Sequence, residues 1–224
     1  MINKPLISLM ILALTLLFTS SIFANTYQMA DNTMYKDVQQ VKVHYSGNIT
    51  QKKSAAFMSV LDEINQRYVN AKDLTISFSS DGGDMDAALS MYYAIKSSQI
   101  PVTTVNISAV VSAATIPFCA ADKREAADNA VFIIHPAQMD TLDEHDVTPA
   151  KIRTSQDFIR TYNDLFRRIY AKCSNLTSEE LNRPLDSDGD RLYLSAKEAL
   201  SRHLATAKFS KLPVAPVSYY VTDD

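Results

Sequence analysis

The sequence lacks the marks of a nucleic-acid-binding protein. It contains no tryptophan and no run of basic residues, and its 25 aspartates and glutamates outnumber its 22 lysines and arginines, which gives a formal net charge of −3. Binding to a phosphate backbone depends on clustered positive charge. We therefore expect no nucleic-acid partner.

Long hydrophobic runs are missing too, except at the N-terminus. There a single lysine precedes an apolar run over residues 6–18, and small residues lead to a cleavage point after Ala24. This layout is typical of a secretory signal peptide, and the run is shorter than the ~20 apolar residues that a membrane span needs. We predict a signal peptide over residues 1–24 and an exported domain over residues 25–224, periplasmic or secreted, with no membrane span.

Cysteine is scarce, and no internal repeat or low-complexity segment is present. The two cysteines are Cys119 and Cys173. In an oxidising compartment such a pair either forms a disulfide or stays as two separate buried thiols, and the sequence leaves both open. The residues that remain after removal of the signal peptide are enough for one domain with its own core.

The exported part of the sequence alternates between strand and helix patterns. The predicted strands cover residues 41–45, 74–78, 102–107 and 131–134. The predicted helices cover residues 51–68, 86–97, 112–121 and 151–173. In the last helix, Phe158, Tyr162 and Phe166 are expected to face inward, and the tail over residues 209–224 is expected to be extended and partly exposed. This alternation predicts a single α/β domain.

Glycine is the rarest of the small residues, with only 4 in 224 against a usual share of roughly 7%. Two of the four, Gly82 and Gly83, stand side by side between a predicted strand and the helix that follows it. Backbone N–H groups at such a helix start are unpaired and favour negative charge. Taken alone, the pair is equally well explained as a tight strand-to-helix turn.

A serine and a histidine occupy similar places farther along the chain. Ser112 follows a predicted strand and begins a helix rich in small residues, and His135 stands at the end of a buried strand before a proline. A serine becomes a nucleophile at neutral pH only beside a base, and imidazole is the usual one. Each residue alone has a structural explanation, in helix packing for the serine and in hydrogen bonding for the histidine.

Five segments in order resemble the proteolytic subunit of the Clp protease, within the crotonase-like fold. The segments are SGNIT, SSDGGDMDAALSMYYAI, SAVVSAA, VFIIHPA and LYLSAKEAL, and the resemblance runs from about Val41 to Ala205. It implies an α/β fold built as a spiral of repeated ββα units in one domain. It also implies that Ser112 is the nucleophile and His135 the general base, with the backbone N–H groups of Gly83 and Ala113 as the oxyanion hole.

The resemblance places the third member of the catalytic triad less directly. In the family an aspartate lies four residues before the serine of the closing segment, which is Ser195 here, and that position holds Arg191. The adjacent Asp190 is the expected acid if one residue is inserted. Asp188 is the second candidate, and a Ser-His dyad without an acid is the third possibility.

The chain also departs from the family pattern. Asp81 replaces the proline of the glycine loop, Ser108 replaces a glycine of the nucleophile motif, and Pro117 is expected to kink or shorten the helix after Ser112. The segment over residues 137–151 contains no glycine, whereas the family has a glycine-rich strand there that helps to join two rings. The double-ring assembly of the family is therefore in doubt.

These observations predict an exported, ATP-independent serine endopeptidase that acts on peptides or unfolded proteins. We expect a homo-oligomer, because the fold usually buries its long helix against a neighbour, and no ATPase partner. The alternatives are an inactive binding or scaffold protein and a crotonase-type enzyme acting on acyl thioesters. We expect no cofactor and no metal, because the calcium-like run that starts at Asp186 has Arg191 at its glycine position and Lys197 at its glutamate position.

Overall fold

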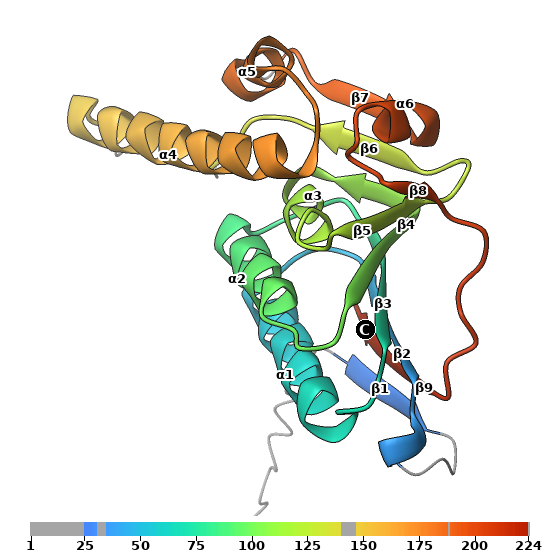
Figure 1. Cartoon of the computed structure of the whole chain (residues 1–224). Helices are drawn as coiled ribbons and strands as arrows, with labels where there is room; N and C mark the ends of the chain where they lie inside the picture. Colours follow the sequence, from blue (N-terminus) through green and yellow to red (C-terminus); the bar gives the residue numbers. More distant parts are fainter. Residues whose placement is uncertain (1–24, 31–34, 140–146, 188, 224) are drawn as a thin grey trace, which may run out of the picture.

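The computed structural model of the chain describes residues 25–30, 35–139, 147–187 and 189–223 (Figure 1). Nine strands form one sheet with the order β1-β9-β2-β3-β4-β5-β8, and β6 pairs with both β4 and β7. The strands are β1 Asn25–Ala30, β2 Gln40–Ser46, β3 Asp73–Ser80, β4 Val102–Val111, β5 Lys123–Ala126, β6 Val131–Ile134, β7 Leu192–Ser195, β8 Ala207–Lys208 and β9 Val217–Thr222. The predicted signal peptide lies outside the described residues.

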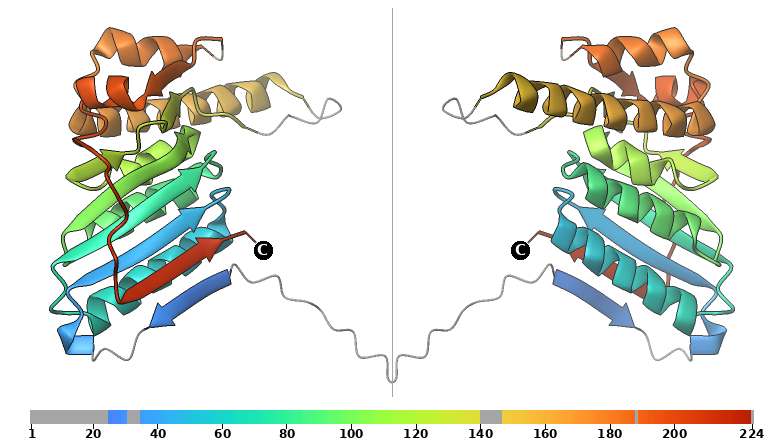
Figure 2. Two further views of the ribbon diagram at one scale, coloured as in Figure 1. Left: turned by 90° about the vertical axis from the view of Figure 1, so that its right-hand side faces the viewer. Right: turned by 90° about the vertical axis from the view of Figure 1, so that its left-hand side faces the viewer.

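Helices α1 and α2 cover one face of this sheet, and α4 crosses its end and projects from the body (Figures 1 and 2). The helices are η1 Tyr35–Asp37, α1 Gln51–Arg67, α2 Met85–Lys96, η2 Ser112–Ala114, α3 Thr115–Phe118, α4 Pro149–Cys173, α5 Ser178–Asp186 and α6 Ala196–Ser201. Within the described ranges, no helix is both long and apolar enough to cross a membrane.

Helix α1 packs through one apolar stripe, as its sequence pattern predicts. Thr50 caps its first turn by accepting a hydrogen bond from Lys53 N at 3.2 Å. Phe57, Leu61 and Ile64 are buried, and the ring of Phe57 lies 6.0 Å from that of Tyr45 in β2. The first strand-helix-strand unit is thus held by side chains that recur every three or four residues.

Strands β2, β3, β4 and β6 run parallel, so that their C-terminal ends share one edge. The register pairs Ser80 of β3 with Val110 of β4, and Val111 of β4 with Ile133 of β6. The residues that follow β3, β4 and β6 therefore lie next to one another, with the end of β4 in the middle. This edge of a parallel sheet is where α/β proteins place their ligands.

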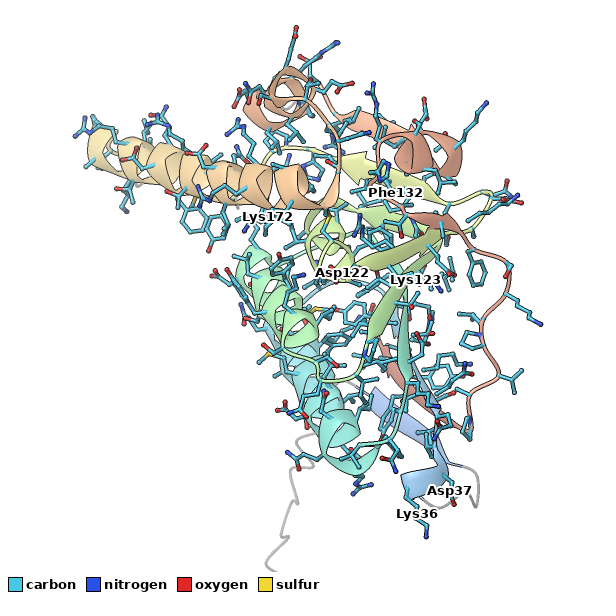
Figure 3. All side chains as sticks on the ribbon, in the orientation of Figure 1. Lys36, Asp37, Asp122, Lys123, Phe132 and Lys172 are labelled. Atoms are coloured by element: carbon cyan, nitrogen blue, oxygen red, sulfur yellow. A yellow bond between two sulfur atoms is a disulfide. The ribbon has the colours of Figure 1, made fainter. Side chains whose placement is uncertain are left out.

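A disulfide joins α3 to the C-terminus of α4. The Sγ atoms of Cys119 and Cys173 lie 2.01 Å apart, which decides between the two states that the sequence left open. Close by, the buried ring of Phe118 packs 5.1 Å from that of Phe132 (labelled in Figure 3). The same region contains Arg124, only 7% exposed, whose guanidinium donates to carbonyl oxygens at the ends of α3, α4 and α6.

The C-terminal tail is extended and partly exposed, as predicted, with Val214 97% exposed, but its last part is also a strand of the sheet. Its residues 217–222 form β9, which runs antiparallel to β1 and parallel to β2, between these two strands (Figure 2). Val217, Tyr219 and Val221 are fully or almost fully buried. The alternation of VSYYV is the pattern of a strand with a buried face, which was not predicted from the sequence.

Helix α4 also differs in part, because only some of its aromatic residues face inward. Phe166 is buried, whereas Phe158 is 37% exposed near the projecting N-terminal half. Ile159 packs against the core, and the ring of Phe158 lies 4.6 Å from that of Tyr162. Ile152, nearer the N-terminus of the helix, is 41% exposed.

Candidate active site

Ser112 has a backbone conformation that side-chain-bearing residues rarely adopt. It follows β4 directly and has a φ of 55°, in the left-handed region. Such a conformation is typically unfavourable by about 1–3 kcal/mol and persists only where the surroundings hold it. The helix that follows consists of one 3-10 turn and the four residues of α3. The shortening expected from Pro117 is confirmed.

Two side chains hold this turn, Thr115 of α3 and Tyr170 of α4. The hydroxyl of Thr115 donates to the carbonyl oxygen of Ser112 at 2.6 Å, and its oxygen lies 2.6 Å from the hydroxyl of Tyr170. Because the Thr115 proton is already used, Tyr170 is the donor in the second bond. Burial raises the pKa of Tyr170 above its ordinary value, which keeps its hydroxyl protonated.

The glycine pair lies against the serine turn. A Cβ atom on Gly82 would lie 2.7 Å from Ser112 Cβ and 2.9 Å from Ala113 N, and one on Gly83 would lie 2.2 Å from the carbonyl oxygen of Ile49. Both glycines have positive φ values, 96° and 142°. The pair is therefore needed for close backbone approach.

The N–H group of Gly83 points away from the neighbouring loop. Ile49 N donates to Gly82 O at 2.7 Å, and Asp84 N donates to Ile49 O at 2.9 Å. Ile49 and Gly83 thus form an isolated parallel bridge. In such a bridge the two bonds to Ile49 come from the peptide groups on either side of Gly83, so the Gly83 N–H itself faces away from Ile49. That direction fits an oxyanion donor.

His135 follows β6, and its ring has a defined tautomer. Its Nδ1 lies 2.8 Å from the carbonyl oxygen of Pro136. A carbonyl oxygen only accepts, so Nδ1 carries the proton and Nε2 is the acceptor nitrogen. This is the tautomer that a general base requires.

One cavity of about 450 Å³ brings these groups together. Its lining includes Ser112, Ala113, Gly83 and His135, and Phe166 and Tyr170 of α4 form part of its wall. Asp81 also lines it, exposed, so a carboxylate lies where the family has a proline. No lysine or arginine is among the described residues of this lining.

Asp190 is not in this lining. Its carboxylate accepts from Arg183 Nη2 at 3.0 Å and from Nε at 3.3 Å. The backbone nonetheless comes close to the histidine: Leu192 of β7 pairs antiparallel with Ile134 of β6, so the residues before β7 approach the end of β6 that carries His135. The role of Asp190 stays a prediction, and Asp188 lies outside the described residues.

Three residues at the site have no counterpart in the sequence prediction. Thr115 and Tyr170 hold the serine turn. Asn163 of α4 accepts a hydrogen bond from Ala137 N, two residues after His135, and donates one to the carbonyl oxygen of Leu185 in α5. Their only sequence signal is polarity inside otherwise apolar helix faces. No group of three or more histidine, cysteine or acidic side chains in the described ranges is placed to hold a metal ion.

Comparisons with known proteins identify the family of the chain. The family described as Clp protease matches residues 26–206. ATP-dependent Clp protease proteolytic subunits from two strains of Dehalococcoides mccartyi are each 30% identical over 131 residues, covering 58% of this chain. The match spans 62% of those relatives' length, which is less than two thirds.

A solved structure has the same fold. A ClpP1 mutant from Listeria monocytogenes superposes with a TM-score of 0.64 at 20% identity, over 78% of this chain and 93% of that one. The ClpP-like fold expected from the sequence is confirmed. Because the family match spans most of the sequence, this chain belongs to the Clp protease family.

Proposed function

We propose that this chain is an exported, ATP-independent serine endopeptidase that cleaves peptides or unfolded proteins. The observation that carries the proposal is the single cavity that contains Ser112, His135, Gly83 and Ala113. The Nε2-acceptor tautomer of the histidine adds to it. Family membership supports a peptidase, and the residue roles are our proposal.

The proposed reaction uses these groups in two steps. Ser112 Oγ attacks the carbonyl carbon of the peptide while its proton moves to His135 Nε2, and the oxyanion accepts hydrogen bonds from the N–H groups of Gly83 and Ala113. Each donor of this kind is worth about 2.7–4 kcal/mol of transition-state stabilisation. The histidine then protonates the leaving amine, and water, deprotonated by the same nitrogen, releases the acyl group from the serine.

Asp190 is the proposed acid of the triad. It acts in that role only after its carboxylate leaves Arg183, because the ion pair now occupies it. The pair is on the surface, with 40% of the Asp190 side chain exposed, and surface pairs are worth only about 0–1 kcal/mol. Opening it is therefore a small step.

Export and assembly complete the proposal. The signal peptide expected over residues 1–24 would place the enzyme in a compartment without ATP, so no ATPase partner is proposed. The projecting half of α4 exposes Phe158 and Ile152, 37% and 41% exposed, and we propose that it packs against a second copy of the chain. Size measurement by light scattering tests this, and a monomer at micromolar concentration would contradict it.

The test of the reaction is covalent labelling with a fluorophosphonate probe. Intact-mass measurement is expected to show one adduct on the protein and none on Ser112→Ala. Ser108→Ala is the matched control, since Ser108 lies in β4, the strand that leads to Ser112, and outside the cavity lining. Labelling that survives in Ser112→Ala would refute the nucleophile. A folded wild-type protein that never labels would instead support a binding or scaffold role.

A further inference from the structure

We infer that Asn163 is a positioning residue that orients His135 through the peptide bond between Pro136 and Ala137. The inference rests on the proposed function, and it concerns the state in which the Asp190 carboxylate is still paired with Arg183.

Three hydrogen bonds form one continuous chain from the imidazole. His135 Nδ1–H donates to the carbonyl oxygen of Pro136 at 2.8 Å. The N–H of the same peptide group, on Ala137, donates to Asn163 Oδ1 at 2.7 Å. Asn163 Nδ2 in turn donates to the carbonyl oxygen of Leu185 at 2.8 Å. All three bonds point in one direction, so each strengthens the next.

The partners fix the orientation of the Asn163 amide. The Ala137 N–H faces Asn163 Oδ1, and the carbonyl oxygen of Leu185 faces Asn163 Nδ2. If the amide were flipped, the Ala137 N–H would meet another donor and the Leu185 carbonyl oxygen would meet another acceptor. The side chain is in the interior, 6% exposed, and Leu185 is fully buried. In such surroundings an amide that lost one partner would be destabilised, which holds the peptide plane in place.

The peptide plane sets the direction of the Pro136 carbonyl, and the carbonyl sets the imidazole. If the plane rotates, the His135 Nδ1–H loses its acceptor. The ring then loses both the tautomer and the orientation that the proposed proton transfer from Ser112 requires. The oxygen also carries partial negative charge, which favours the imidazolium that forms when the histidine takes the serine proton.

The experiment measures the fluorophosphonate reaction of three variants. Asn163→Leu is expected to lower the maximal labelling rate about 100-fold, the scale of a reacting group misplaced by ~1 Å, with the half-saturating probe concentration unchanged. The acid limb of its pH profile is expected to move to lower pH, because the imidazolium loses stabilisation. Asn163→Asp, which in its protonated form offers the same donor and acceptor, is expected to restore most of the rate near pH 6.

Asn106→Leu is the matched control. Asn106 is also buried, donates to Val131 O at 2.8 Å and accepts from Ser108 N at 3.1 Å, at the opposite end of β6 from His135. It is expected to lose stability like Asn163→Leu while its labelling rate and pH profile stay at the wild-type values. Equal rate losses in both variants would reduce Asn163 to a structural residue and overturn the inference.

Two further results separate this inference from the proposed function. Nitrogen-15 NMR of wild-type His135 is expected to show the proton on Nδ1, and a proton on Nε2 at neutral pH would overturn the inference even if Asn163→Leu does not fold. Wild-type labelling in Asn163→Leu together with its loss in Asp190→Asn would also overturn it and leave the peptidase standing. Absence of Ser112 labelling in the wild type would refute the proposed function itself.

Discussion

Removing the disulfide between Cys119 and Cys173 is predicted to destabilise the fold by about 4 kcal/mol. The two cysteines are 54 residues apart in the sequence. For a loop of this length, the cross-link lowers the conformational entropy of the unfolded chain by about 14 cal/mol/K. This stabilises the folded state by ~4 kcal/mol at 25 °C. Both side chains are buried, so substitution by alanine adds a small packing loss.

Urea unfolding of the double variant Cys119→Ala/Cys173→Ala measures this loss. The protein has 11 tyrosines and no tryptophan, so tyrosine fluorescence is the signal. The dependence of the unfolding free energy on urea is expected to become steeper, because an unfolded chain without the cross-link exposes more surface.

The single variant Cys119→Ala is the control for the double variant. It removes the same cross-link, so its loss should nearly equal that of the double variant. A loss of unfolding free energy below about 1 kcal/mol in the double variant would refute the loop-entropy reasoning. So would losses in the single variants Cys119→Ala and Cys173→Ala that add up to the loss in the double variant.

Three other predictions concern separate parts of the molecule. Arg124→Leu is expected to lower the unfolding free energy by about 3 kcal/mol or more, because several buried carbonyl groups lose their donor; a loss under ~1 kcal/mol in urea unfolding would contradict this. Gly82→Ala is expected to slow fluorophosphonate labelling about 100-fold, since the new Cβ would lie 2.7 Å from Ser112 Cβ; wild-type labelling would argue against the close approach. Burial and the nearby Lys42 lower the pKa of His44 below 6.5. The unfolded chain therefore binds more protons than the folded one, and the free energy of unfolding falls as the pH drops below about 6.5. His44→Gln should flatten this dependence of the unfolding free energy on pH, and an unchanged dependence would exclude His44 as its source.

Most of the fold follows from local patterns in the sequence. Strand β3 and helices α1 and α4 have boundaries within two residues of the prediction, because periodic apolar residues mark their buried faces. Strand β5, with the sequence KREA, has no such pattern and forms only because Arg124 and its neighbours pair with β4. A strand whose formation depends on pairing with its neighbour cannot be predicted from its own residues.

The candidate site divides in the same way. Ser112, His135 and the glycine pair each follow a strand, so the order of elements predicts that they meet at one edge. The partner of Asp190 could not be predicted, because Arg183 comes from α5, a helix without a clear sequence pattern. Asn163 was missed for a related reason. Its inferred role comes from the hydrogen bond that it accepts from the Ala137 N–H, and the sequence does not show that these two residues lie side by side.

The position of β9 has a consequence for how the chain reaches its native state. Strand β9 is synthesised after the other described strands and lies between the first two of them, β1 and β2. While the chain is still emerging, β2 has an unpaired edge and β1 has no partner in the sheet, and unpaired edges of this kind recruit other chains. Contacts between residues so far apart in sequence also form slowly. Synthesis that stalls before β9, or removal of residues 215–224 by a protease, should therefore give an aggregating intermediate in which the sheet edge that carries Ser112 and His135 is already assembled.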